Sequence, residues 1–334
     1  MSPRRVRRNE MRIRSAGSRA VLMLLAMVVL ATPVLFAAGQ SESDEVTFVM
    51  VPKLVHPFYE PCYEGFRAAG EHYGINTEFE APAQAEVDLQ VKVIENLISR
   101  GVDGIAISAT DDAGLKGVID EAIAAGITVI TFDADAPSTN RLCYVGTNNR
   151  AAGRTAGEEM VNLLGSDGGK VAMLLATLGA PNLLERAEEF EGALEAAGPQ
   201  YQVVAIEGFE SDLAQAVNKT EALLQTYPDM GAFFGVSAYG SPAAATVIKE
   251  QGKVGDVLVG GFDDLSETLD GIRDGSIQYT LVQKTFNMGW ISVETLMNAM
   301  NGETVPDTVD TGVIIVNSGN VDSYMEEMKQ EVVQ

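Results

Sequence analysis

Residues Phe48–Gly65 read FVMVPKLVHPFYEPCYEG, and this stretch has the strand–loop–helix pattern of an α/β fold. The apolar run FVMV ends in a loop that carries Lys53, His56, Phe58 and Tyr59, and a helical pattern then begins. In an open α/β sheet, ligands lie at the loops that leave the carboxyl ends of the strands. A cation, an imidazole and two rings suit a polyhydroxylated molecule, because rings cover C–H surfaces and polar groups bond hydroxyls. A strand-to-helix turn whose rings pack inward would use the same residues, so both interpretations stay open at this point.

Strand-like and helix-like segments alternate through the first half of the chain. The predicted strands are Val46–Val51, Asn76–Glu80, Gly104–Ile107, Thr128–Phe132 and Cys143–Val145. The predicted helices between them are Tyr59–Tyr73, Glu86–Arg100 and Ala113–Ala125, followed by the C-cap glycines Gly74, Gly101 and Gly126. This alternation implies a parallel sheet with right-handed crossovers.

The same alternation starts again after Thr147. The predicted helices are Ala151–Leu164, Asn182–Ala197, Asp212–Gln225, Pro242–Gln251, Ser266–Gly271 and Met288–Met300. The predicted strands are Lys170–Leu175, Gln202–Glu207, Ala232–Gly235, Val257–Gly260, Ile277–Val282 and one near Val313–Val316. We therefore expect an α/β protein of two lobes, whose strand ends face one cleft. The expected first lobe is residues 44–147 plus 284–310, and the second is 148–283 plus 311–334, with crossings near Thr147, Lys284 and Asp310.

The first 39 residues have the pattern of a secretory signal peptide. Seven arginines precede the apolar run Ala20–Phe36, and the small residues Ala37-Ala38-Gly39 follow it. A retained membrane anchor is disfavoured, because Thr32-Pro33 interrupts a run that is already marginal for spanning. No cysteine closes the run, so the lipid-attachment pattern of bacterial lipoproteins is missing. We expect export to the periplasm, from a start at Met1 or Met11.

Charge and composition exclude several classes of function. Beyond residue 39 the balance is 16 basic against 46 acidic side chains, or −30, because the leader holds seven arginines and one glutamate. Such a surface repels phosphate backbones, which argues against nucleic-acid binding. The two cysteines, Cys62 and Cys143, favour two buried thiols over a disulfide. With only His56 and His72 available as imidazoles, neither a metal site nor a cofactor is expected.

The predicted strand ends carry polar side chains. Asp133 and Asp135 follow one strand, where they could accept hydrogen bonds from vicinal hydroxyls, act in acid/base catalysis or cap a solvated turn. A glycosidase needs a defined separation between its carboxylates, which two residues on one short turn rarely provide. The other candidate ligand contacts at the strand ends are Asn182, Arg186, Ser237, Asp263 and Gln283.

These motifs support a resemblance to a known family. HPFY after the first strand, ITFDAD after the fourth, and VGTNNRAAGRTAGE at the first crossing carry it, together with NLLERAEEF, GFDD and YTLVQ further on. Over about residues 45–325, the chain resembles the ribose/galactose-type periplasmic sugar-binding proteins, the type I solute receptors of ABC importers. The resemblance implies two Rossmann-like lobes joined by a three-stranded hinge.

The resemblance also assigns residues to the ligand. It places the family's aromatic sandwich on Phe58 and Tyr59, with His56 in place of the usual asparagine, and its polar contacts on Asp133, Arg186, Asp263 and Gln283. Three departures argue against ribose itself: Ala134 replaces an arginine, Ser237 an asparagine and Ser211 an aromatic residue. The pair Pro52-Lys53 in the first loop resembles the corresponding loop of rhamnose and autoinducer-2 receptors, in which the lysine can reach the ligand. Lys53 is therefore a further candidate contact.

The resemblance implies an exported, monomeric, non-enzymatic receptor. It would close its lobes on a sugar or similar polyol and deliver this ligand to the membrane permease of an ABC importer. The same receptor could signal to a chemoreceptor or sensor kinase, and the sequence does not separate transport from sensing. Two other classes are disfavoured: a sugar-responsive transcription regulator, because this acidic chain begins with an export signal, and a periplasmic glycosidase.

Overall fold

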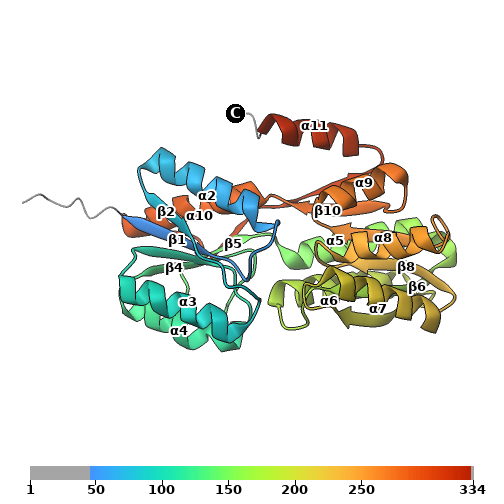
Figure 1. The fold of residues 1–334 in the computed structure, drawn as a ribbon, viewed down its shortest axis with the longest axis horizontal. Coiled ribbons are helices and arrows are strands. Elements are labelled where there is room, and N and C mark those ends of the chain that lie inside the picture. Colours follow the sequence, from blue (N-terminus) through green and yellow to red (C-terminus); the bar gives the residue numbers. More distant parts are fainter. Residues whose placement is uncertain (1–45, 332–334) are drawn as a thin grey trace, which may run out of the picture. The chain divides into compact units, whose positions relative to one another are not determined.

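The computed structural model describes residues 46–331, which form an α/β fold with two lobes, each built on a six-stranded sheet (Figure 1). The predicted signal peptide lies outside the described residues. The first sheet runs, in spatial order, β11 (Thr308–Asp310), β5 (Tyr144–Gly146), β4 (Thr128–Phe132), β3 (Gly104–Ile107), β1 (Thr47–Val51) and β2 (Asn76–Phe79). The second runs β12 (Val313–Asn317), β10 (Tyr279–Gln283), β9 (Leu258–Phe262), β8 (Met230–Gly235), β6 (Gly169–Leu175) and β7 (Tyr201–Gly208).

Helices cover both faces of the first sheet. Phe48 and Met50 of β1 pack toward α2 (Tyr59–Tyr73) and α10 (Thr285–Met300), which Figure 1 shows on one side of the strands. Val49 and Val51 pack toward α3 (Val87–Arg100) and α4 (Asp112–Ala124) on the other side. Because both faces of each strand are buried, the strands read as continuous apolar runs in the sequence.

The second sheet is covered in the same way. One face holds α5 (Asn149–Leu164) and α6 (Pro181–Ala197), and a short 3-10 helix, η1 (Gly165–Asp167), follows α5. The other face holds α7 (Leu213–Thr226), α8 (Gly240–Glu250), α9 (Ser266–Asp274) and α11 (Val321–Glu331). The predicted alternation of strands and helices is confirmed in both lobes.

The end of the chain differs from the sequence-based expectation. Neither β11 nor α11 was predicted, and β12 runs antiparallel to β10, pairing Tyr279 with Asn317 and Gln283 with Val313. The second sheet is therefore parallel except at this edge. The reversal follows from connectivity, because β12 enters its sheet directly from β11 of the other lobe with no crossover helix between them.

The structure confirms two predictions made from local sequence, the glycine C-caps and the free cysteines. Gly74 and Gly101, predicted as C-caps, take the left-handed backbone conformation with φ of 71° and 68°. Cys62 and Cys143 are both free and buried, as predicted. None of the helices within residues 46–331 has the length and apolar character needed to cross a membrane.

In the first lobe, glycines bring two helices into close contact. A Cβ on Gly289 of α10 would lie 1.8 Å from the carbonyl oxygen of Cys62, and a Cβ on Gly65 of α2 would lie 2.0 Å from that of Phe286. The contact is backbone against backbone, so a side chain at either position forces the helices apart. Gly153 and Gly157 of α5 approach the backbone of α6 in the same way.

We therefore predict that Gly289→Ala lowers the free energy of unfolding by about 2 kcal/mol or more, because the added methyl overpacks a rigid contact. Urea denaturation measures this loss. Gly117→Ala on α4 is the matched control, since nothing lies within 4 Å of its added Cβ. The control should be neutral or stabilise the protein by up to about 1 kcal/mol. Equal effects of the two substitutions would contradict the close contact.

Candidate functional site

A cavity of about 590 Å³, its open mouth included, lies where the strand-end loops of the two lobes meet. Ten of the eleven predicted contact residues line it: Lys53, His56, Phe58, Tyr59, Asp133, Asn182, Arg186, Ser237, Asp263 and Gln283. The remaining lining residues include Leu54, Ala85, Ala176, Thr177, Leu183, Phe209, Ser211, Ala238 and Tyr239. Parallel strands bring their carboxyl ends to one edge of a sheet, which is why loops far apart in the sequence gather here.

Asp133 is the polar centre of the first lobe's wall and is only 3% exposed. Its Oδ2 accepts hydrogen bonds from Ser108 Oγ at 2.6 Å and from Tyr59 Oη at 2.9 Å. Burial and the neighbouring Asp133 carboxylate raise the pKa of Tyr59 well above its usual value, so the phenol stays protonated and donates. The Asp133 carboxylate is thus held in one orientation by two hydroxyls.

Lys53 joins this cluster from the loop after β1. Its Nζ lies 3.7 Å from Asp133 Oδ2 and donates to Asn182 Oδ1 at 3.1 Å. Asn182 Nδ2 in turn lies 3.4 Å from Asp133 Oδ1. Burial lowers the pKa of Lys53, and the Asp133 carboxylate opposes that change. Since Asn182 belongs to the first turn of α6, this triangle of side chains connects the two lobes.

Arg186 is the corresponding centre of the second lobe, 1% exposed. Its Nε donates to Asn149 Oδ1 at 2.9 Å and its Nη2 to Gln283 Oε1 at 2.6 Å. The guanidinium carbon lies 4.1 Å from the ring centre of Phe262, a cation–π contact. A buried charge is stable only when it is compensated in this way.

Asp263 completes the second lobe's wall. Its Oδ1 accepts from Gln283 Nε2 at 2.9 Å, so Gln283 connects Asp263 to Arg186. Burial raises the pKa of Asp263 to about 7, although Arg186 and the Gln283 amide both oppose the increase. This carboxylate therefore changes its charge near neutral pH.

The two strand-end aspartates share an unusual backbone. Asp133 has φ of 56° and Asp263 has φ of 68°, a region that non-glycine residues adopt only when neighbours hold them there. The neighbouring strand does so in each lobe: Tyr144 Oη donates to the carbonyl of Asp133 at 2.9 Å, and Thr280 Oγ1 to that of Asp263 at 2.7 Å. Each lobe thus presents one carboxylate to the cavity by the same device.

The aromatic residues differ in part from the predicted sandwich. Phe58 and Tyr59 meet edge to face at 5.0 Å, and Tyr59 is 4% exposed with its hydroxyl bonded to Asp133. Phe58 is half-buried and turns toward the cavity. From the second lobe Phe209 lines the cavity, two residues before Ser211, where the resemblance expects a ring.

His56 lies at the rim, against the second lobe. Its Nδ1 accepts a hydrogen bond from the backbone amide of Phe58 at 3.1 Å, and burial lowers its pKa. The imidazole is therefore neutral at pH 7, and its proton is on Nε2. Its ring centre lies 4.7 Å from that of Tyr239 in the loop after β8.

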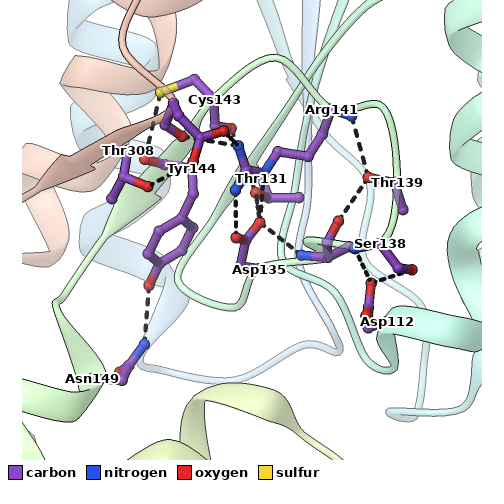
Figure 2. Close-up of polar contacts among 12 residues, drawn as sticks. Asp112, Thr131, Asp135, Ser138, Thr139, Arg141, Cys143, Tyr144, Asn149 and Thr308 are labelled. Atoms are coloured by element: carbon purple, nitrogen blue, oxygen red, sulfur yellow. Dashed lines mark hydrogen bonds and ion pairs between the residues drawn. The ribbon is translucent and has the colours of Figure 1, made fainter.

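Asp135 is the predicted contact that does not line the cavity. Figure 2 shows its carboxylate directed at Thr131 and Arg141. Arg141 Nη2 donates to Asp135 Oδ2 at 2.6 Å, and Arg141 Nη1 donates to Asp307 Oδ1 at 2.6 Å. Asp135 thus ties the loop after β4 to the segment before β11. The expectation failed because alternate residues of a turn need not share a direction as they do on a strand.

Buried polar residues that the sequence did not reveal support the cavity wall. Gln90 of α3 is fully buried, and its Nε2 donates to the carbonyls of Pro52 at 3.2 Å and Ser108 at 2.8 Å. One amide thus fixes the loops that carry Lys53 and the hydroxyl partner of Asp133. Asn149, the partner of Arg186, lies in the motif VGTNNRAAGRTAGE but is not among the predicted site residues. A glutamine among the apolar positions of one helix face is the sequence signal that could have identified Gln90.

The arrangement suits binding rather than catalysis or metal coordination. The Asp133 and Asp263 carboxylates are each held by donors, and none of their partners is a histidine poised as a base. Among the described residues, no group of three His, Cys, Asp or Glu side chains is placed to hold a metal ion. The cavity therefore presents fixed hydrogen-bond donors and acceptors beside the rings of Phe58 and Phe209.

Comparison with known proteins gives the class. The chain matches the periplasmic binding protein domain over residues 47–304 and belongs to that family. It is a sugar-binding solute-binding protein of the ABC-importer type and not an enzyme.

Individual relatives agree with this class. A solute-binding protein of an ABC transporter from Burkholderia graminis, solved in complex with D-arabinose, is 37% identical, has a TM-score of 0.81, and is matched over 84% of this chain and 98% of that one. AraP, an arabinose-binding protein from Geobacillus stearothermophilus, is 33% identical, has a TM-score of 0.71, and is matched over 84% and 99%. The ribose import binding protein RbsB of Bacillus subtilis is 29% identical over 259 residues, 78% of this chain and 83% of its own length.

The placement of the two aspartates predicts opposite effects on binding. Asp135→Ala should leave the Kd for sugar within about twofold of the wild type, while the loss of the Arg141 pair lowers the free energy of unfolding by about 1–2 kcal/mol. Asp133→Ala should weaken binding at least about 100-fold, because it removes an acceptor from the cavity wall. Isothermal titration and urea denaturation of both variants measure these effects. A large loss of affinity in Asp135→Ala would show instead that Asp135 contacts the ligand.

Proposed function

We propose that this protein is exported to the periplasm, where it binds an aldopentose of the arabinose type as a monomer and delivers it to an ABC permease. The observation that carries the proposal is the pair of buried carboxylates, Asp133 and Asp263, presented from opposite lobes toward one cavity. Vicinal hydroxyls of a sugar ring can donate to both carboxylates at once. The arabinose-associated relatives, at 37% and 33% identity, support this choice of sugar.

The cavity supplies the other parts of a sugar site. Arg186 keeps guanidinium N–H groups beyond those bonded to Asn149, Gln283 and the Val236 carbonyl, and these can donate to ring or anomeric oxygens. Phe58 and Phe209 offer apolar faces from the two lobes to the C–H surfaces of the ring. Ten of the eleven predicted contact residues, all but Asp135, therefore remain proposed ligand contacts.

Binding must replace contacts that the lobes already make with each other. Lys53 donates to Asn182 across the cavity, and both side chains would turn to a hydroxyl-bearing ligand. The affinity of the closed form therefore depends on how much more the sugar contributes than the contacts it displaces. We propose that the permease recognises the closed form.

Lys53 favours a second candidate ligand class. An ammonium group in the loop after β1, with Asp133 beside it, is the feature that the sequence shares with rhamnose and autoinducer-2 receptors. A 6-deoxyhexose or a small branched polyol is therefore the alternative ligand that a binding test must include.

We predict that D-arabinose raises the Tm of the purified mature protein by about 5 °C or more at 100 times its Kd. Differential scanning fluorimetry over arabinose, ribose, xylose, galactose, rhamnose and autoinducer-2 measures the shift, and titration calorimetry should give one site per chain. Arg186→Ala should lose the shift while keeping the circular dichroism of a folded protein. A shift from rhamnose or autoinducer-2 alone would favour the second class, and no shift from any compound would overturn the function.

Asp263 makes sugar binding depend on pH. The ionised carboxylate accepts two hydroxyl donors, whereas the protonated acid uses one oxygen as a donor, so affinity should fall as the pH drops through about 7. The Kd should be about tenfold weaker at pH 6 than at pH 8. Asp263→Asn should bind weakly with no pH dependence in this range. A wild-type Kd that is flat from pH 6 to 8 would contradict the role of the ionised carboxylate.

A further inference from the structure

The C-terminal helix α11 lies beyond the part of the chain that matches the family domain, residues 47–304. It follows β12 and packs alongside α9 of the second lobe (Figure 1). Val321 and Tyr324 are 3% and 7% exposed and belong to the same apolar cluster as Leu269 and Ile272 of α9. The helix is therefore packed on the lobe through an apolar face.

Two polar contacts join α11 to the two ends of α9. Tyr324 Oη donates to Asp264 Oδ2 at 2.6 Å, just before α9 begins. Arg273 Nη2, in the last turn of α9, lies 2.6 Å from Asp322 Oδ1 at the start of α11. The Tyr324 contact is partly buried, whereas the Arg273 and Asp322 side chains are 47% and 77% exposed, so the first contact fixes geometry more firmly.

Asp264 is the residue directly after Asp263. The left-handed backbone of Asp263 is held on one side by β10, through Thr280 Oγ1 on its carbonyl and the carbonyl of Leu281 on its amide at 2.8 Å. These contacts fix the peptide groups of Asp263 but not the course of the loop after it. Tyr324 anchors that course, since its hydroxyl holds the side chain of the next residue, Asp264.

We propose that Tyr324 is a positioning residue for sugar binding: through Asp264 it holds Asp263 in the orientation that presents its carboxylate to the cavity. This inference rests on the proposed function, because it assigns the role of Asp263 to ligand contact. Tyr324 itself does not line the cavity. The C-terminal helix α11 would thus contribute to binding by positioning Asp263, although it does not contact the ligand.

Tyr324→Phe tests the proposal, because it keeps the ring in the apolar cluster and removes only the hydroxyl. We expect the Kd for D-arabinose to rise about tenfold, mainly through faster dissociation, while the Tm of the sugar-free protein changes by no more than that of the control. The control is Tyr227→Phe, which removes a hydroxyl that donates to the Val204 carbonyl at 3.1 Å in the same lobe, outside the cavity.

A pH profile separates positioning from general stabilisation. The charged groups that influence Asp263 are Arg186 of α6, Asp264 in its own loop and Asp133 of the other lobe. If the loop relaxes in Tyr324→Phe, water reaches the Asp263 carboxylate and the midpoint of the pH-dependent Kd moves to lower pH. The Tyr227→Phe control should keep the wild-type midpoint.

A double-mutant cycle and a sugar-free measurement complete the test. Asp264→Ala should weaken binding by a similar factor, and the double variant should be no weaker than the poorer single one, because both remove the same contact. Hydrogen exchange without sugar should be faster at residues 263–265 in Tyr324→Phe than in the control. Unchanged exchange, or a Kd and pH midpoint equal to the control's, would overturn the proposal. A wild-type protein that binds no sugar would overturn the proposed function instead, and the exchange result would still judge the role of Tyr324.

Discussion

The burial of the Arg186 guanidinium is the constraint on which the site depends. A charge that is 1% exposed must find partners within the protein, and this one finds them on three separate elements: Asn149 at the start of α5, Gln283 at the end of β10 and the Val236 carbonyl after β8. Asn149 and Gln283 stand beside the points where the chain crosses between the lobes. The Arg186 guanidinium thus fixes side chains of the cavity wall and connects them to the segments where the chain passes between the lobes.

The close approach of α5 and α6 serves this arrangement. A Cβ on Gly153 would lie 2.3 Å from the carbonyl oxygen of Arg186, so only a glycine lets the two helix backbones come this near. The approach brings Asn149 and Arg186, both on the facing sides of these helices, within hydrogen-bonding distance. Helix packing therefore decides the position of a side chain in the binding cavity.

The two lobes present their carboxylates by the same physical device but in different electrostatic settings. Asp133 receives two hydroxyl donors and has Lys53 beside it, while Asp263 receives one amide donor and its pKa is raised by burial to about 7. In the lobe that carries Asp133, Gln90 fixes the loops of Ser108 and Lys53. The lobe that carries Asp263 relies on β10 and on the contact between Tyr324 and Asp264.

By itself the sequence determined the order of strands and helices, β11 and α11 excepted, and the residues at each strand end. Both are local properties: apolar runs, helix periodicity and capping glycines act over a few residues, and parallel strands necessarily bring their carboxyl ends together. That is why ten of the eleven predicted residues line the cavity. The tertiary structure alone decided the direction of β12, the departure of Asp135 toward Arg141, and the roles of Gln90, Phe209 and Tyr324. Each of these depends on partners far away in the chain, and no local pattern records which distant group a buried polar side chain will meet.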